Sequence, residues 1–464
     1  MNTPSDPGHT SRRQAHWALA VLTLVYAMNL IDRQIMGVLI EPVKKEFGAS
    51  DTMMGFLTGL AFAAFYSALA IPFARYADRA NRRNFVAWCC LGWSVMTGLC
   101  GMATSFAQLA MARMGVAVGE AGGSAPSLSM IADLYPRAQR SRVMSVYMMG
   151  PHLGTLFGLG AGAWIAHQYG WRTAFIVMAV PGILAALLLR WTCVEPLRGR
   201  WDAPAAPGGD ASTTTAGQGA AGAGTASGPV ETQTTQAKQP LRQVLLEVWR
   251  TPGFAWIAVS GMLFGLAGYG LGIWGTAFLV RTHGLNLRDA GILVGLTGGV
   301  AAIIGALASG WLTDKLVARD PRWQMGVPII GTAIAIPLGL AYLLWPAGDF
   351  WQVGALKVPV AMAFSLLFSV FAVWWTAPSY AAITTLVGAS RRATSVAVYN
   401  LGLTVCGIGL GPFSVGVLSD LLTPAFGSLA LRWALVVVMA GFVLAMIALI
   451  LAARPYARAL AKGV

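Results

Sequence analysis

Residues 113–133 read Arg-Met-Gly-Val-Ala-Val-Gly-Glu-Ala-Gly-Gly-Ser-Ala-Pro-Ser-Leu-Ser-Met-Ile-Ala-Asp, a stretch that is small or apolar almost throughout. Arg113 and Glu120 interrupt it seven residues apart. On one continuous helix, this spacing places both side chains on the same face, two turns from each other. Ionisable residues inside a membrane-spanning helix are costly and indicate function. The remainder of the chain decides whether this stretch spans a membrane.

The composition is typical of a polytopic membrane protein. Of the 464 residues, 56% are hydrophobic and 11% are charged, whereas soluble proteins carry about 25% charged residues. The formal net charge of +14 falls in short clusters between apolar runs, without an aromatic-interleaved basic patch. The charge therefore indicates membrane topology and not nucleic-acid binding. The five cysteines have neither metal-like nor disulfide-like spacing, and we expect no metal site and no cofactor.

Apolar windows of about 20 residues, long enough to cross a bilayer, recur along the whole chain. They predict an all-α membrane protein with twelve transmembrane helices in two six-helix bundles. The predicted spans are 16–40, 51–74, 84–104, 108–132, 142–166 and 172–194, followed by 253–280, 287–312, 325–346, 355–385, 394–419 and 431–453.

The expected domain organisation follows from these spans. It comprises a tail over 1–15, a first bundle over 16–196, a linker over 197–250, a second bundle over 251–453 and a tail over 454–464. The linker is poor in bulky apolar residues over about 201–240, which predicts disorder there. The apolar spacing in 241–249 predicts a short amphipathic helix on the membrane surface.

The basic residues predict the orientation. Arginine clusters such as Arg12-Arg13, Arg82-Arg83 and Arg391-Arg392 fall on one side of the predicted spans, while the opposite loops carry few charges of mixed sign. By the positive-inside rule, both termini are cytoplasmic. We therefore expect a multi-pass protein of the bacterial inner (plasma) membrane.

The two halves resemble each other. The segment 74–79 follows the second span, as the segment 310–315 follows the eighth, and each carries an acid followed by a base. The fifth and eleventh spans are both rich in glycine. Two repeated six-helix halves joined by a linker are typical of a transporter that rocks one half against the other.

The loop after the second span carries a family resemblance. Residues 74–83 read Ala-Arg-Tyr-Ala-Asp-Arg-Ala-Asn-Arg-Arg, which resembles the G-x-L-A-D-R-x-G-R-R loop of the major facilitator superfamily. Ala74 and Asn81 replace the two glycines of that motif, so the loop geometry is expected to differ. The resemblance covers essentially the whole chain outside 201–240, and it implies the fold but not the substrate.

Within that superfamily the chain is most similar to the spinster branch. Tyr26, Asn29 and Asp32-Arg33 match the first helix of that branch. Arg113 with Gly119-Glu120-Ala121, followed by Pro126 and Asp133-Leu134, matches its fourth helix. The resemblance implies a proton-driven carrier of lysophospholipids or sphingosine phosphates. Other members of the fold move sugars, organic anions and drugs, which leaves a small anion or drug as the alternative substrate.

Arg113 and Glu120 have two interpretations. They could form an ion pair that only holds the bundle together, although a buried pair is weak evidence for stability. The alternative is proton coupling, because burial favours a protonated carboxyl group and a nearby guanidinium favours its charged form. Asp32 is the second candidate proton carrier. The resemblance implies that the first and fourth helices line one central cavity, and we therefore assign proton coupling to Asp32, Glu120 and Arg113.

The second half lacks such charges. The spans 253–280 and 355–385 contain no acid, and their only base is Lys357, near one end. An apolar wall opposite an ionic one suits an amphiphile better than a sugar. The predicted substrate-binding residues are Arg33, Asn29, Tyr26, Arg113, Tyr269, Trp274, Trp374, Trp375 and Tyr380. The aromatic residues of the second half have an alternative role as interfacial belts.

Charged residues at the predicted cytoplasmic ends of the helices are assigned to gating. The alternative is that these charges only set the orientation of the helices in the membrane. These residues are Asp78, Arg79, Arg82, Asp133, Asp314 and Lys315. A membrane-embedded enzyme or a channel is disfavoured, because the sequence contains no convergent nucleophile or metal set and no filter-like segment. The expected partners are an amphiphilic or lipid substrate, protons and membrane lipids, and no nucleic acid. We expect the protein to be a monomer.

Overall fold

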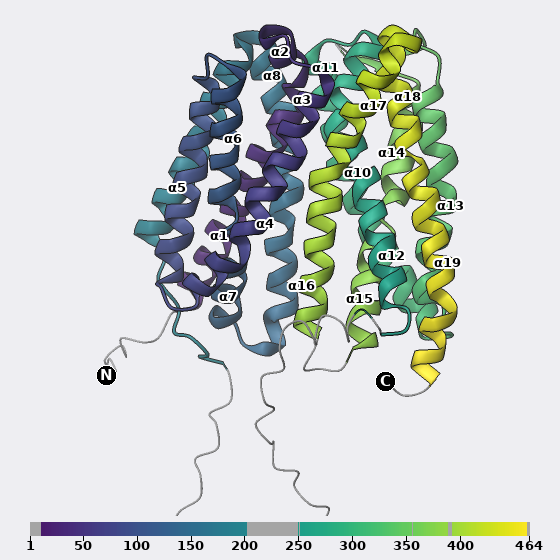
Figure 1. The fold of residues 1–464 in the computed structure, drawn as a ribbon. Helices are drawn as coiled ribbons and strands as arrows, with labels where there is room; N and C mark the ends of the chain where they lie inside the picture. The colour runs from purple at the N-terminus through teal and green to yellow at the C-terminus, as the bar shows by residue number, and fades with distance from the viewer. Residues whose placement is uncertain (1–10, 202–248, 250, 355, 388–391, 462–464) are drawn as a thin grey trace, which may run out of the picture.

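A computed structural model of the chain describes residues 11–201, 249, 251–354, 356–387 and 392–461 (Figure 1). The segment at about 201–240 that is predicted to be disordered lies outside the described residues, apart from Trp201. The predicted amphipathic helix 241–249 also lies outside them, apart from Trp249.

The first half of the chain is helical. Four of its helices begin at polar capping residues: Ser11, Ser50, Asn81 and Ser105 each accept a hydrogen bond from a backbone N–H of the first turn. The elements are α1 (Arg12–Val38), α2 (Ile40–Phe47), α3 (Asp51–Gly55), the π-helical turn η1 (Phe56–Leu60), α4 (Ala61–Ala77), α5 (Arg82–Gly101), α6 (Phe106–Glu120), α7 (Ser124–Leu134) and α8 (Arg137–Thr192).

The second half is also helical, with one small hairpin. Its elements are α10 (Phe254–His283), α11 (Leu287–Leu296), η2 (Thr297–Ala301), α12 (Ala302–Val317), α13 (Trp323–Leu344), β1 (Phe350–Val353), β2 (Leu356–Pro359), α14 (Ala361–Ala372), α15 (Thr376–Leu386), α16 (Arg392–Leu403), η4 (Thr404–Leu410), α17 (Gly411–Phe426), η5 (Gly427–Leu429), α18 (Ala430–Val438) and α19 (Ala440–Ala461).

The described residues contain nine helical stretches that are long and apolar enough to cross a membrane. One of them, 142–192, has 51 residues and would measure about 77 Å if straight, more than twice the ~30 Å of a bilayer core. Gly170 breaks it with a φ of 85°, a conformation that glycine adopts without strain. The helical membrane class is confirmed, and the number of twelve crossings stays a prediction.

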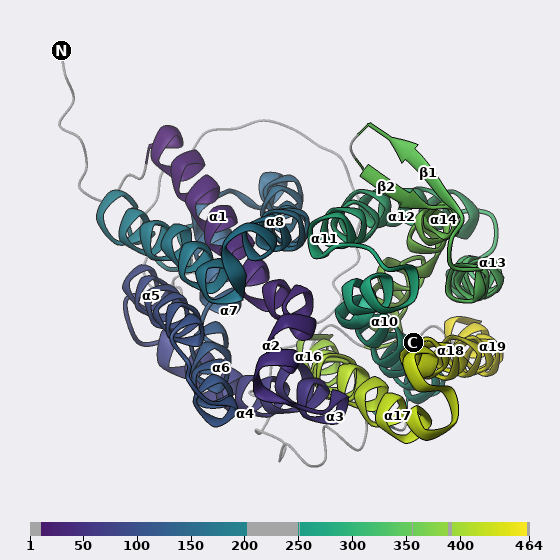
Figure 2. The same cartoon turned by 90° about the horizontal axis from the view of Figure 1, so that it is seen from above.

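The helices form two groups. Seen from above in Figure 2, α1–α8 lie on one side and α10–α19 on the other. Small residues permit close approach between the groups: a Cβ atom on Gly291 of α11 would lie 2.2 Å from the Cβ of Ala163 in α8, and one on Gly55 would lie 2.6 Å from the carbonyl oxygen of Pro412. Such contacts are typical of packing between membrane helices. The predicted domain boundaries stay predictions.

Two sequence-based expectations were wrong in detail. The span predicted over 355–385 begins inside a hairpin, because β1 and β2 pair antiparallel, with Trp351 opposite Val358. The span predicted over 108–132 is not one helix. It ends at Glu120, turns at residues 121–123 and resumes as α7, where the Gly122-Gly123 pair favours a break.

Candidate functional site

Glu120 forms a buried ion pair with Arg33. The Nη2 and Nε atoms of Arg33 donate to Oε2 of Glu120 at 2.6 and 3.2 Å. The Glu120 side chain is 0% exposed and that of Arg33 is 14% exposed, so the pair lies inside the protein. The second carboxylate oxygen, Oε1 of Glu120, is buried without a hydrogen bond to the described residues, while Asn29 lies beside it.

Arg113 forms no ion pair with Glu120 in this conformation, although the sequence left such a pair open as one of two interpretations. Its Nη1 donates to the backbone carbonyl of Asp32 at 2.8 Å, and its Nη2 to that of Arg33 at 3.3 Å. Both residues lie in α6, but the Glu120 carboxylate accepts from Arg33 of α1, so the ion-pair interpretation of Arg113 and Glu120 is not seen in this conformation. Arg113 instead joins α6 to α1 at the backbone of Asp32 and Arg33. The role of Arg113 in proton coupling stays a prediction.

Two aromatic residues of α4 complete the site, and sequence reasoning missed both. The Arg33 guanidinium lies 4.8 Å from the ring centre of Phe62 and 5.3 Å from that of Tyr66. The Arg113 guanidinium lies 5.3 Å from the Phe62 ring. Such contacts stabilise a cation that has left water. The available signal was the four-residue spacing of Phe62 and Tyr66 in the second span, which places them on one helix face.

The Asp32 carboxyl group forms no ion pair with Arg33 or Arg113 among the described residues. Its residue is 1% exposed, and its Oδ1 is buried without a hydrogen bond to the described residues. Thr97 and Trp93 of α5 lie close to the carboxyl group, and their own polar atoms are also unpaired among the described residues. Asp32 therefore joins the cluster through its backbone carbonyl, while its side chain faces α5.

A small cavity opens onto the ion pair. It measures about 170 Å³, and its walls include Arg33, Glu120, Asn29, Tyr26 and Tyr269. Tyr26 stacks on Tyr147 with ring centres 4.7 Å apart. Five of the predicted proton-coupling or substrate-binding residues thus line one cavity, four from the first half and Tyr269 from the second.

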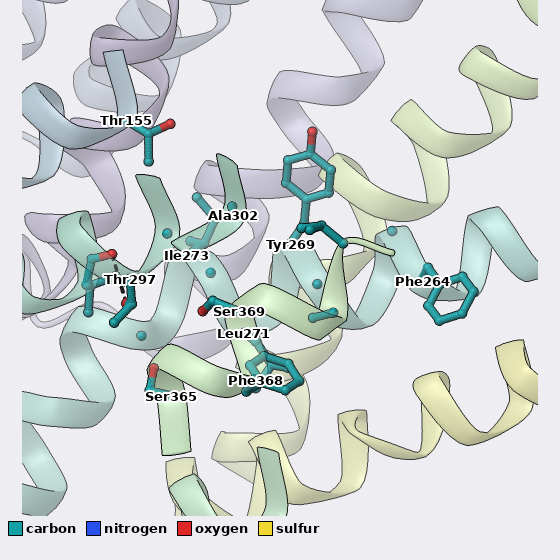
Figure 3. A pocket seen from close by; sticks show the side chains of 18 of the residues that line it. Thr155, Phe264, Tyr269, Leu271, Ile273, Thr297, Ala302, Ser365, Phe368 and Ser369 are labelled. Carbon is teal, nitrogen blue, oxygen red and sulfur yellow. Dashed lines mark hydrogen bonds between the residues drawn. The ribbon is translucent and has the colours of Figure 1, made fainter. Parts of the chain in front are cut away.

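A larger cavity of about 400 Å³ adjoins the second half. Helices α10, α11, α12, α14 and α15 supply most of its walls, with η2, α1 and α8 also contributing. Figure 3 shows Phe264, Leu271, Ile273 and Phe368 around it, with Thr155 of α8 on the opposite side. None of the residues that line it is ionisable apart from tyrosine. The chamber can hold hydrocarbon with a few hydroxyl contacts.

Tyr269 lines both chambers. Of the other predicted aromatic residues, Trp375 lines the larger cavity and stacks on Phe264 with ring centres 5.0 Å apart. Tyr380 donates a hydrogen bond to Asn400. The structure places Trp274 and Trp374 outside both cavities. Trp274 is fully buried and donates to the carbonyl of Pro412 at 2.9 Å, and Trp374 packs on Phe371.

A charged cluster ties the two halves together at the end of the molecule that carries α2 and α3, here called the outer end (Figure 1). The Arg281 guanidinium donates to Asp51 at 2.6 and 2.8 Å and to Glu41 at 2.7 Å. Lys44 and Ser419 also donate to Asp51, at 2.5 and 2.6 Å. The Asp51 side chain is 3% exposed.

Helix α17 adds backbone contacts to the same closure. Asp420 accepts hydrogen bonds from the backbone N–H groups of Asp51 and Thr52 at 3.1 and 2.7 Å. Further in, the π-helical turns η1 and η4 approach each other, since a Cβ atom on Gly59 would lie 2.4 Å from the carbonyl oxygen of Gly409. These residues, which sequence reasoning missed, close the outer end.

The charges predicted to gate the opposite end, here called the inner end, do not bridge the two halves in this conformation. Arg82 donates to Asp133 at 2.5 Å and to Glu195 at 2.8 Å, all within the first half. The backbone carbonyl of Asp78 accepts a hydrogen bond from Arg198, and Lys315 lies over the Trp311 ring. No ion pair is found for Asp78, Arg79, Asp314 or Lys315 among the described residues. Their assignment to gating stays a prediction.

Replacing Arg82 with alanine is expected to destabilise the first half by about 3–5 kcal/mol, because Asp133 and Glu195 would lose their buried partner. The midpoint of thermal unfolding in detergent measures the loss. Arg79→Ala, in the same loop but at an exposed position, is the matched control and should leave the midpoint nearly unchanged. Equal midpoints for both variants would contradict a structural role for Arg82.

Comparisons with known proteins agree with this architecture. The chain matches the family model described as Major Facilitator Superfamily over residues 22–412. It is 34% identical to an MFS-type efflux pump of Mycolicibacterium smegmatis, over 94% of this chain and 92% of that protein. It is 27% identical to the sphingosine-1-phosphate transporter SPNS2 of Danio rerio, over 89% and 77% of the two chains.

A solved structure is also similar. The crystal structure of a bacterial homologue of the human lysosomal transporter spinster, in an inward-facing and occupied conformation, superposes with a TM-score of 0.74. The two chains are 28% identical, and the match covers 97% of this chain and 98% of that one. The predicted resemblance to spinster transporters is confirmed.

Proposed function

The chain belongs to the major facilitator superfamily of membrane transporters, and on this premise we propose that it is a proton-coupled carrier of a lysolipid or similar amphiphile. The carrier works by alternating access across the bacterial plasma membrane, with both termini in the cytoplasm. A superfamily member of this kind moves its substrate and does not transform it, so no enzymatic role is assigned.

One observation carries the choice of substrate: an ionic chamber and an apolar chamber meet at Tyr269. The smaller cavity presents Arg33 and Glu120, and the larger one presents hydrocarbon and aromatic walls. An amphiphile fits this pair, with an anionic headgroup beside Arg33 and an acyl chain in the larger cavity. The similarity to a sphingosine-1-phosphate transporter supports this choice.

Proton coupling rests on the competition for Arg33. In this conformation the guanidinium neutralises Glu120 at 2.6 Å. An anionic headgroup that binds Arg33 would weaken this pairing, and the buried carboxylate would then be stabilised by taking up a proton. Substrate and proton would thus bind to the same state, which couples their movement.

The closed outer end supports alternating access. The contacts of Arg281 and Asp420 join the two halves there, whereas the predicted inner-gate charges make no ion pair across the halves among the described residues. Under the predicted topology this conformation faces the cytoplasm. Rocking would break the outer contacts and bring the inner charges together.

A small organic anion or drug is the second candidate, favoured by the similarity to an efflux pump. The test is uptake into proteoliposomes under an imposed pH gradient, with lysolipids of several chain lengths and with small aromatic acids. Transport that rises with chain length supports the amphiphile. Transport of the acids alone supports the alternative, and no pH dependence for any substrate would contradict a proton-coupled carrier.

Filling the larger cavity is expected to lower the affinity for substrates with long acyl chains more than for those with short ones. Ser369→Phe places a ring into this cavity from α14, and each displaced methylene costs about 0.8 kcal/mol, so losing two lowers the affinity by roughly ten-fold. Binding of long-chain and short-chain lysolipids, measured by competition, reads out the difference. Leu366→Phe on the same helix points outward, at 47% exposure, and should change neither affinity. Equal losses of affinity for both chain lengths would show that the larger cavity does not bind the acyl chain.

A further inference from the structure

Two polar residues of the first half face the larger cavity. Gln34 of α1 and Thr155 of α8 both line it, and Nε2 of Gln34 donates to Oγ1 of Thr155 at 3.4 Å. Figure 3 shows Thr155 apart from the apolar side chains of the second half. A ligand in this cavity would therefore meet a carboxamide and a hydroxyl group on the side of the first half.

The carboxamide of Gln34 has hydrogen-bonding capacity that the protein does not use. A carboxamide offers two N–H donors and an oxygen with two lone pairs, and the bond to Thr155 is the one that it makes among the described residues. That bond is longer than the usual range of about 2.7–3.2 Å. The hydroxyl groups of Thr155 and Thr297, in contrast, already donate to backbone carbonyls four residues earlier, at 3.0 and 3.1 Å. Gln34 can thus still bind a polar atom of a ligand.

Gln34 lies at the boundary between the ionic and the apolar cavity. It follows Arg33 directly in α1, so the two side chains leave the helix at nearly the same depth, about 100° apart. Arg33 lines the smaller cavity and Gln34 the larger one, while Tyr269 lines both. Helix α8 packs against the base of the Gln34 side chain, since a Cβ atom on Gly158 would lie 3.6 Å from the Cβ of Gln34. A ligand with its headgroup at Arg33 would bring the atoms that follow the headgroup beside Gln34.

We propose that Gln34, supported by Thr155, recognises a hydroxyl group that lies between the anionic headgroup of the substrate and its acyl chain. A hydroxyl group both donates and accepts a hydrogen bond, and the carboxamide offers the complementary N–H and carbonyl oxygen. A lysolipid carries such a hydroxyl group on its glycerol. A site that binds a substrate hydroxyl group discriminates against the analogue that lacks it. This inference rests on the proposed function, because it places the headgroup at Arg33.

Competition binding to the full chain tests the proposal with two probes, lysophosphatidic acid and the matched analogue in which hydrogen replaces the glycerol hydroxyl group. The native protein should bind lysophosphatidic acid about three- to ten-fold more tightly, which is the effect of one hydrogen bond. Gln34→Met keeps the length of the side chain and removes its polar atoms, so it should bring the ratio of the two affinities close to one. The thermal unfolding midpoint without ligand verifies that the variant is folded.

Thr297→Val is the matched control. It removes a hydroxyl group from the same cavity, but one that already donates to the carbonyl of Leu293, and it should keep the native ratio of the two affinities. Equal affinities of the native protein for both probes would overturn the inference and leave an amphiphilic cargo in place. A native ratio in Gln34→Met would overturn it as well. Binding of neither probe would contradict the proposed cargo, and this inference with it.

Discussion

Glu120→Gln is expected to abolish substrate accumulation driven by a pH gradient, to the level of protein-free vesicles. Glutamine has nearly the same shape, and its carbonyl oxygen can still accept the hydrogen bond from Arg33. It cannot bind and release a proton, so the exchange that couples substrate to the gradient is lost. Exchange of labelled for unlabelled substrate without a gradient should continue. The measurement is uptake and exchange in the same proteoliposomes.

Controls separate coupling from stability. The variant leaves Arg33 buried without its counter-charge, which costs about 3–5 kcal/mol; adding Arg33→Gln should restore the unfolding midpoint but not the accumulation. Glu46→Gln replaces an exposed acid at the outer end, 40% exposed, and should leave accumulation unchanged. Asp32→Asn tests the second candidate carrier. Full accumulation in the Glu120 variant would disprove its role in coupling.

Arg281→Gln is expected to open the outer end. It removes three charge-assisted hydrogen bonds, two to Asp51 and one to Glu41. The loss of a buried partner costs about 3–5 kcal/mol. Because only the closed conformation would lose these contacts, its population relative to the open one should fall roughly 100-fold or more. Electron–electron distance measurements between labels at exposed Lys45 and Ser428 should show a longer distance.

The matched control is Arg172→Gln, at the same end of the molecule. Arg172 pairs with Glu46 within the first half, and both side chains are more than a third exposed. Hydrogen bonds from Arg172 and Trp171 hold the pKa of Glu46 below its usual range, yet this pair does not join the halves. The label distance should therefore match the native one. A native distance distribution in Arg281→Gln would show that the outer cluster does not decide the conformation.

Much of the site was predictable because its residues stand out in their local sequence. Tyr26, Asn29, Arg33 and Glu120 interrupt apolar spans, and all four line the smaller cavity. Phe62 and Tyr66 were not predicted, because aromatic residues are ordinary in an apolar span and only their position against Arg33 distinguishes them. Trp274 is the opposite case, because it was predicted to bind substrate but lines neither cavity. Its indole donates to a backbone carbonyl, and the sequence does not distinguish such a tryptophan from one that lines a cavity.

The stretch at 113–133 shows where local information ends. By itself the sequence determined that this chain is a helical membrane protein. It also predicted that its halves repeat and that the spans 253–280 and 355–385 lack the acids that the first half carries. Those properties depend on hydrophobicity and spacing, which are local. Only the tertiary structure decided that α6 ends at Glu120 and that Arg33, not Arg113, neutralises it. It also brought Asp51, Arg281 and Asp420 together from three distant helices. Such pairings depend on how helices approach one another, and that is set by packing across the whole fold.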